Sequence, residues 1–244
     1  MPAEPASAGL SEPQRIIDVF VAPSKTFEDI RRNASWWVPW LIGGIFAISI
    51  SLLFSKKVDM EPIVREQLAA RGAAWDNLSK EQQDQQVAFG LKIAKITPYV
   101  FPVFSIVAGL VVAAILMAVF SFVHEASVPF SRSLAIFFYA GLPGIITAIL
   151  AMITLMTASD MEGRNPRNLV ATNLAYFMDY HNTSKFLYGM AASLDIITIW
   201  VIVLLGIGFK VVSGKPKLST GTAVGTVFAV YLLYRLVVSG LGWV

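Results

Sequence analysis

Five long apolar stretches, separated by polar segments, constrain the fold of this chain more than any other feature of its sequence. A helix needs about 20 mostly apolar residues to cross the ~30 Å hydrocarbon core of a bilayer. The stretches cover residues 36–54, 97–123, 134–158, 186–212 and 220–243. We therefore predict an all-α, polytopic integral membrane protein that folds as a bundle of five transmembrane helices.

The composition supports a membrane protein and argues against several other classes. Hydrophobic residues make up 56% of the chain and charged residues only 14%, whereas soluble domains carry about a quarter charged residues. The net charge of +3 is typical of basic membrane loops rather than of nucleic-acid binding. The chain has no cysteine, and no paired carboxylates, nucleophile arrangement or metal-ligand cluster is recognisable. We expect no enzyme activity, no cofactor, no metal site and no nucleic-acid partner.

The polar segments divide the chain into three parts. Residues 1–13 are predicted to be a disordered tail, residues 14–35 an amphipathic interfacial segment of short helices, and residues 36–244 the five-span domain. The amphipathic segment either lies on the membrane surface or packs on the protein's own loops, and its pattern does not distinguish the two. Within the domain, residues 55–96 form a polar insert, which we predict to be a helical extramembrane hairpin.

Two sequence signals mark where helices begin. Ser11, followed by Glu12 and Pro13, is typical of a helix start. Ser79 with Gln82 three residues later resembles a capping box, in which each residue bonds to the other's backbone N–H. In the insert, Pro62 is predicted to open a first helix, and Pro98 and Pro102 to bend or interrupt a second helix that leads into span two.

Two charges, Asp195 and Arg235, lie well inside the apolar stretches that form spans four and five, whereas Lys210 lies near the end of span four. Asp195 precedes Lys215, the centre of the turn between these spans, by as many residues as Arg235 follows it. In an antiparallel helical hairpin the two side chains therefore reach the same depth, which favours a structural intramembrane ion pair between Asp195 and Arg235. The alternative is that Asp195 caps the start of span four and Arg235 extends its charge to the water boundary.

Small and aromatic residues give further predictions about packing. The third span contains a proline between two glycines, which predicts a kink or an unwound turn. A pair of glycines four residues apart in span five predicts close helix packing, within this chain rather than between copies. Three tryptophans at the start of span one are typical of an interfacial belt. The residues for packing or kinks are Gly141, Pro143, Gly144, Gly206, Gly208, Gly221 and Gly225, and those of the belt are Trp36, Trp37 and Trp40.

Three stretches of the chain resemble the bacterial branch of the Yip-one domain family. They are VFVAPSKTFEDIRRNASWWVPWLI, FFYAGLPGIITAIL and SLDIITIWVIVLLGIGFKVVSGKPKLSTGTAV. The resemblance implies a five-span protein of the bacterial cytoplasmic membrane with its N-terminus in the cytoplasm and its C-terminus on the opposite side. Charge counts of the loops do not decide this orientation. Eukaryotic relatives bind Rab-type GTPases, but no GTPase-binding segment is recognisable here, so that partner is not transferred.

Two functions are compatible with these features. The first is a non-enzymatic membrane protein that organises membrane partners or bilayer shape, with the lipid bilayer and other membrane proteins as its partners. The alternative is a transporter, or an accessory subunit of a transport complex, which would use Asp195, Arg235 and the kink in span three. A transporter needs a polar, water-accessible pathway at mid-membrane depth, whereas an organiser can pair or cap its charges.

Overall fold

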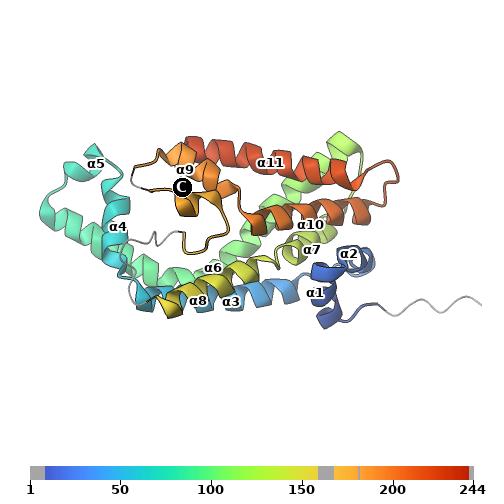
Figure 1. Cartoon of the computed structure of the whole chain (residues 1–244), viewed down its shortest axis with the longest axis horizontal. Helices are drawn as coiled ribbons and strands as arrows, with labels where there is room; N and C mark the ends of the chain where they lie inside the picture. The colour runs from blue at the N-terminus through green and yellow to red at the C-terminus, as the bar shows by residue number, and fades with distance from the viewer. Residues whose placement is uncertain (1–8, 159–167, 181, 242–244) are drawn as a thin grey trace, which may run out of the picture.

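The computed structural model describes residues 9–158, 168–180 and 182–241. In this part of the chain the regular structure is helical, apart from one isolated bridge between Asn173 and Asp195 (Figure 1). Five helical segments there are long and apolar enough to cross a membrane, which confirms the predicted all-α, five-span architecture. They are α3 (Trp37–Lys57), α6 (Lys80–His124), α7 with α8 (Phe130–Thr157), α10 (Ile196–Ser213) and α11 (Thr220–Gly240).

The N-terminal helices begin at the predicted signal. Helix α1 (Glu12–Val21) starts after Ser11, whose side chain accepts the Gln14 N–H in a complete capping box. The predicted disordered tail is therefore too long at its C-terminal end, and residues 1–8 of that tail lie outside the described residues. Helix α2 (Pro23–Ile30) follows immediately, and the two helices form a short hairpin.

The long helix α6 is continuous from Lys80 to His124. Of the two predicted effects of Pro98 and Pro102, a bend or an interruption, the interruption therefore does not occur. Its capping box of Ser79 and Gln82 forms as predicted. Membrane helices tolerate proline where neighbouring groups satisfy the freed backbone. The carbonyls freed here are those of Ala94 and Pro98. The Trp40 indole N–H donates to a different carbonyl, that of Pro102, over 3.0 Å and so joins α3 to α6. At ~1.5 Å per residue the 45 residues of α6 extend about 68 Å, roughly twice the hydrocarbon thickness.

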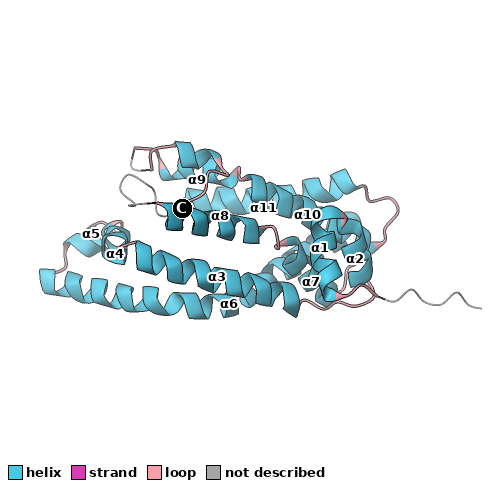
Figure 2. Ribbon diagram, turned by 60° about the horizontal axis from the view of Figure 1, so that its bottom comes forward, coloured by secondary structure: helices cyan, strands magenta, loops and turns pink. Residues whose placement is uncertain are grey.

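The first turns of α6 form part of the helical hairpin that the polar insert predicts, and its position outside the membrane stays a prediction. Helix α4 (Met60–Ala69) begins two residues before Pro62 because Asp59 caps it, and the short α5 (Ala73–Asp76) follows. Both lie beside the first turns of α6, beyond the end of α3 (Figure 2). Four buried apolar residues hold the hairpin together: Val64, Leu68, Trp75 and Val87.

Spans three and four are interrupted at particular residues. Span three consists of α7 (Phe130–Ala140) and α8 (Gly144–Thr157), separated by a three-residue turn. The predicted fourth span began too early, because residues 185–193 form a separate helix α9 (Lys185–Ser193) and the membrane helix α10 starts at Ile196. A 3-10 turn, η1 (Leu174–Phe177), precedes α9 and contacts it.

The buried core lies towards one end of the bundle. We call this end the N-terminal side, because α1, α2 and the turns at 125–129 and 214–219 lie there; the opposite end, which carries α4 and α5, is the far side (Figure 1). Lys215 joins the two turns, donating from Nζ to the His124 carbonyl over 2.5 Å and pairing with Glu125 at 3.0 Å. The principal core includes Phe27, Leu116, Phe120, Ile136, Tyr139, Leu204, Phe209 and Val227.

Helices α1 and α2 complete this core rather than resting only on lipid. Helix α2 packs along α10 and contacts α7, and α1 also contacts α7. Val19, Phe27 and Ile30 are fully buried. Of the two alternatives for the amphipathic segment, the structure shows packing on the protein itself, although on membrane helices and not on loops.

Candidate functional site

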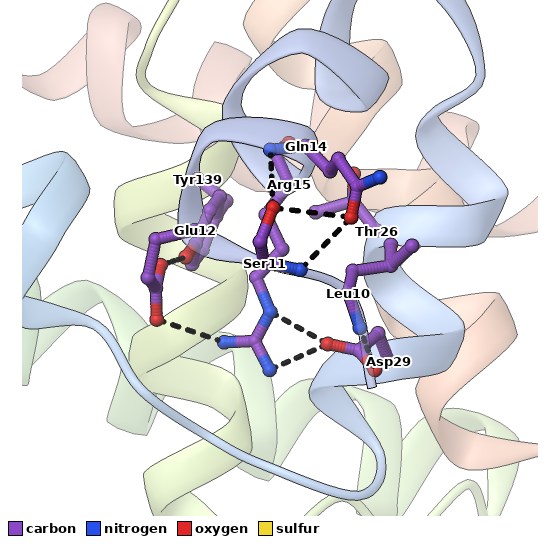
Figure 3. A network of polar contacts seen from close by, with 8 residues as sticks. All are labelled: Leu10, Ser11, Glu12, Gln14, Arg15, Thr26, Asp29 and Tyr139. Atoms are coloured by element: carbon purple, nitrogen blue, oxygen red, sulfur yellow. Dashed lines mark hydrogen bonds and ion pairs between the residues drawn. The ribbon is translucent and has the colours of Figure 1, made fainter. Parts of the chain in front are cut away.

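A buried polar cluster fastens the N-terminal hairpin to the bundle (Figure 3). Arg15 of α1 is only 2% exposed. Its Nε donates to Asp29 Oδ2 of α2 over 2.6 Å, and its Nη2 lies 2.5 Å from the same oxygen. Its Nη1 lies 3.3 Å from Glu12 Oε1 in the same helix. One guanidinium therefore joins the two helices and also holds the first turn of α1.

The cluster reaches span three through Tyr139. The Tyr139 hydroxyl donates to Glu12 Oε2 in a short hydrogen bond. Thr26 donates from its hydroxyl to the Arg15 carbonyl over 3.0 Å, and the Leu10 N–H donates to Asp29 Oδ1 over 3.1 Å. We call Glu12, Arg15, Asp29 and Tyr139 the N-terminal clamp.

The clamp keeps Arg15 charged despite its burial. Burial disfavours the cation, but hydrogen bonds and Coulombic attraction involving Tyr139 and Asp29 outweigh that effect and raise the pKa of Arg15 above its usual value. An arginine already titrates far above neutral pH. The arrangement therefore provides a permanent cation between two carboxylates, which positions α1 against α2.

The structure does not form the predicted ion pair between Asp195 and Arg235. Asp195 is the N-cap of α10: its Oδ1 accepts the Thr198 N–H over 2.8 Å. Its Oδ2 accepts the Thr172 hydroxyl over 2.5 Å, and the Ile196 N–H donates to the Thr172 carbonyl over 3.0 Å. The carboxylate therefore starts the membrane helix and ties it to the preceding loop, which is the alternative that the sequence left open.

Arg235 bonds to a different helix. Its Nη2 donates to the Gly189 carbonyl of α9 over 2.6 Å, while its buried Nε has no partner among the described residues. Four residues earlier in α11, the Tyr231 hydroxyl donates to the Ser193 carbonyl over 3.1 Å. Cationic and hydroxyl donors near the C-terminal end of a helix satisfy its free carbonyls. Arg235 therefore docks α9 onto α11 and does not simply extend to water.

We expect Asp195 and Arg235 to contribute to stability independently. Asp195→Ala removes an N-cap and should cost about 1–2 kcal/mol, whereas Asp195→Asn keeps the cap and should cost only a few tenths. A double-mutant cycle with Arg235→Gln, measured by unfolding in mixed micelles, should give a coupling below about 0.5 kcal/mol. A coupling of about 1 kcal/mol or more between the two sites would show that the charges interact after all.

The glycines fall into two groups. A Cβ on Gly206 would lie 2.6 Å from Val224 Cα, and one on Gly208 would lie 2.5 Å from Ile136 Cγ2, so both positions allow helices to touch. Nothing lies within 4 Å of Gly225, and Gly221 meets only Ser219 Oγ at 3.9 Å. The prediction of close packing within the chain at Gly221 and Gly225 is therefore wrong, because that face of α11 points away from α10.

The break in span three is an unwound turn, as predicted. Gly141 follows the last residue of α7, Pro143 precedes α8, and the Leu142 N–H donates to the Tyr139 carbonyl over 3.2 Å. Leu142 itself is buried in the core. The turn therefore packs against the bundle, and Gly144, the first residue of α8, has open space where a Cβ would be.

The three tryptophans do not form one uniform belt. Trp37 is 56% exposed, as an interfacial residue should be. Trp36 stacks on Phe138 with ring centroids 5.4 Å apart, and Trp40 packs against Trp36 and bonds to α6. Trp36 and Trp40 therefore join α3 to its neighbours, because the first turn of α3 lies against α6 and α7.

The comparisons with known proteins agree with this architecture. The model of the Yip1 domain matches residues 17–239, which is most of the chain and extends from the second half of α1 through the fifth span. The chain belongs to the Yip1 domain family. As a Yip1 domain protein with five apolar helices it is a multi-pass integral membrane protein in contact with lipid. Neither the curated proteins nor the solved structures gave a match.

Sequence reasoning missed the N-terminal clamp of this Yip1 domain. Arg15 and Asp29 fall within the predicted amphipathic segment, residues 14–35, but neither they nor Tyr139 were singled out as site residues. A signal was present, because Arg15 lies four residues before the apolar Val19, and Asp29 lies between Phe27 and Ile30. One charge on the apolar face of each of two successive short helices, with opposite signs, indicates a buried pair between them.

Proposed function

We propose that this chain is a non-enzymatic organiser of the membrane, whose tapered body shapes the bilayer and holds partner proteins. The observation that carries the proposal is the uneven packing of the bundle. In α6 the residues of the principal core lie between Val112 and Phe120, and in α11 they lie between Ala223 and Tyr231. Among the described residues, this core therefore ends before the far side.

Packing of this kind has consequences for the surrounding bilayer. Figure 1 shows α6 and α11 meeting on the N-terminal side, where His124 Nε2 lies 2.7 Å from Thr226 Oγ1, and diverging towards the far side. A body that is tightly packed in one leaflet and splayed in the other occupies unequal areas in the two leaflets. It also leaves apolar helix faces that lipid tails or other membrane helices must cover.

The contacts of the two intramembrane charges support an organiser over a transporter. Asp195 is engaged as a helix cap and Arg235 on a carbonyl, so each has a structural role. The orientation we propose places the N-terminus in the cytoplasm of a bacterium, with Lys210, Lys215 and Lys217 around the turn between α10 and α11 on the same side. Short basic loops favour the cytoplasmic face.

Insertion of the protein into preformed vesicles tests this function. A Lys25→Cys variant, the only thiol in the chain, would report orientation by labelling with an impermeant maleimide. We expect vesicle diameters, measured by cryo-electron microscopy, to fall as the protein-to-lipid ratio rises, with no dissipation of an imposed proton gradient. Unchanged diameters together with proton flux that is lost in Asp195→Asn would instead establish the transporter.

A further inference from the structure

One face of α6 changes its chemistry along its length. Residues at helical spacing on this face begin with Gln82, Gln85 and Gln86 and continue with Phe89, Ile93 and Ala94. Positions three and four residues apart share one helix face, so these side chains form a single stripe. The stripe is polar at its outer end, within the extramembrane hairpin, and apolar at its inner end.

The stripe is the floor of a large groove of about 980 Å³. The last turns of α3 form one wall, with Ile50 and Phe54, and α4 forms the other, with Ile63 and Leu68. A Cβ on Gly90 would lie 2.5 Å from Val64 Cγ1, so the missing side chain lets α4 sit directly on α6 and hold its wall in place. Cavities that bind small molecules are typically about 300–1,000 Å³.

The depth of the groove matches one leaflet of a bilayer. Lys56 and Lys57 follow Phe54 at the end of α3 and mark the level of the membrane surface. From Phe89 to Pro98, the apolar part of the groove extends about 14 Å along α6. One leaflet contributes about half of the ~30 Å hydrocarbon core. An acyl chain therefore fits the length of the inner part, with its headgroup end towards the glutamines.

The outer end of the groove carries a cation without a counter-charge. Arg71 lines the groove, and it has no ion pair among the described residues. Arg65, the other arginine of the hairpin, is paired with Glu61 at 3.0 Å and Asp84 at 3.3 Å. An unpaired guanidinium beside several amide groups is suited to an anionic oxygen ligand such as a phosphate.

We infer that this groove binds one anionic phospholipid from the adjoining leaflet. An acyl chain lies along Phe89, Ile93 and Ala94, and the phosphate accepts hydrogen bonds from Arg71 and the glutamine amides. The inference is independent of the proposed organising function, because the groove lies on the far side, away from the N-terminal core.

Lipid retention by the purified, full-length protein tests the inference. Delipidated protein in detergent is incubated with phosphatidylglycerol or phosphatidylcholine, and bound lipid is counted by native mass spectrometry. We expect the unsubstituted protein to retain phosphatidylglycerol preferentially. Arg71→Ala should lower its affinity for phosphatidylglycerol about tenfold, the loss expected for a hydrogen bond to a charged group. Ala94→Trp fills the apolar end and should lower retention of both lipids.

The matched control is Lys92→Ala, which removes a cation from the same helix but from a face that does not line the groove. Its affinity should stay within about twofold, as for other exposed charges. Thermal unfolding of each variant establishes that it is folded. Equal retention of the two lipids, equal effects of Arg71→Ala and Lys92→Ala, or full retention in Ala94→Trp would overturn the inference. Failure of the unsubstituted protein to retain lipid would do so too, and would favour a protein segment as the occupant.

Discussion

Replacing Arg15 by leucine is expected to destabilise the protein by about 3–5 kcal/mol, because the substitution leaves Asp29 as an uncompensated buried charge. Asp29 is 6% exposed and has no other cation among its described contacts. The same substitution releases Glu12 from Arg15 and so weakens the link to Tyr139. Reversible unfolding in mixed micelles, followed by circular dichroism, measures the loss.

Two further variants test whether the loss comes from the buried charge that Arg15→Leu leaves unpaired. Lys25→Leu removes an exposed cation from the same hairpin and should change stability by no more than about 0.5 kcal/mol. The double variant Arg15→Leu with Asp29→Leu removes both buried charges and should recover much of the loss, since apolar replacement of a buried pair is often neutral. If Arg15→Leu were as mild as Lys25→Leu, the clamp would not hold the hairpin.

Gly206→Ala should cause the second large loss of stability, because it disturbs the contact between α10 and α11. The new Cβ would lie 2.6 Å from Val224 Cα and 2.7 Å from Val224 N. Because these are backbone atoms, the two helices must separate along their contact. Overpacking of this kind costs about 1–3 kcal/mol, and we expect the upper part of that range.

Gly225→Ala provides the matched control on the facing helix. Nothing lies within 4 Å of the position that its Cβ would occupy. Alanine is about 1 kcal/mol more favourable than glycine inside a helix, so this variant should be neutral or more stable in the same unfolding titration. Destabilisation of similar size in both variants would mean that α11 presents a different face to α10.

The architecture could be predicted because its signals are local. Each span is a run of apolar residues long enough for a bilayer. The helix start at Ser11 is marked by the adjacent Glu12 and Pro13, and the start at Ser79 by Gln82 three positions later. The extramembrane hairpin followed from the polarity of residues 55–96. The predicted start of span four was too early because residues 186–193 carry no charge and lead directly to the apolar helix α10.

The contacts between helices could not be predicted in the same way. Counting residues from the turn places Asp195 and Arg235 at one depth, but rotation about each helix axis, 3.6 residues per turn, decides which side each faces. Thr172 and Gly189, the actual partners, lie in segments whose positions depend on the whole fold. An amphipathic pattern such as that of α2 is likewise the same whether a bilayer or α10 covers it.

The central claim, a bundle that is closed on the N-terminal side and splayed on the far side, is tested most directly by pulsed electron paramagnetic resonance in liposomes. The chain has no native cysteine, so spin labels can be placed in pairs between α6 and α11. One pair, at Val123 and Gly225, reports the N-terminal side, where His124 Nε2 lies 2.7 Å from Thr226 Oγ1. The other, at Val111 and Val237, reports the deeper part of the same two helices.

We predict that the distance between the two labels is clearly longer for the Val111–Val237 pair than for the Val123–Gly225 pair. Equal or shorter separation there would show a parallel bundle and contradict the tapered organiser.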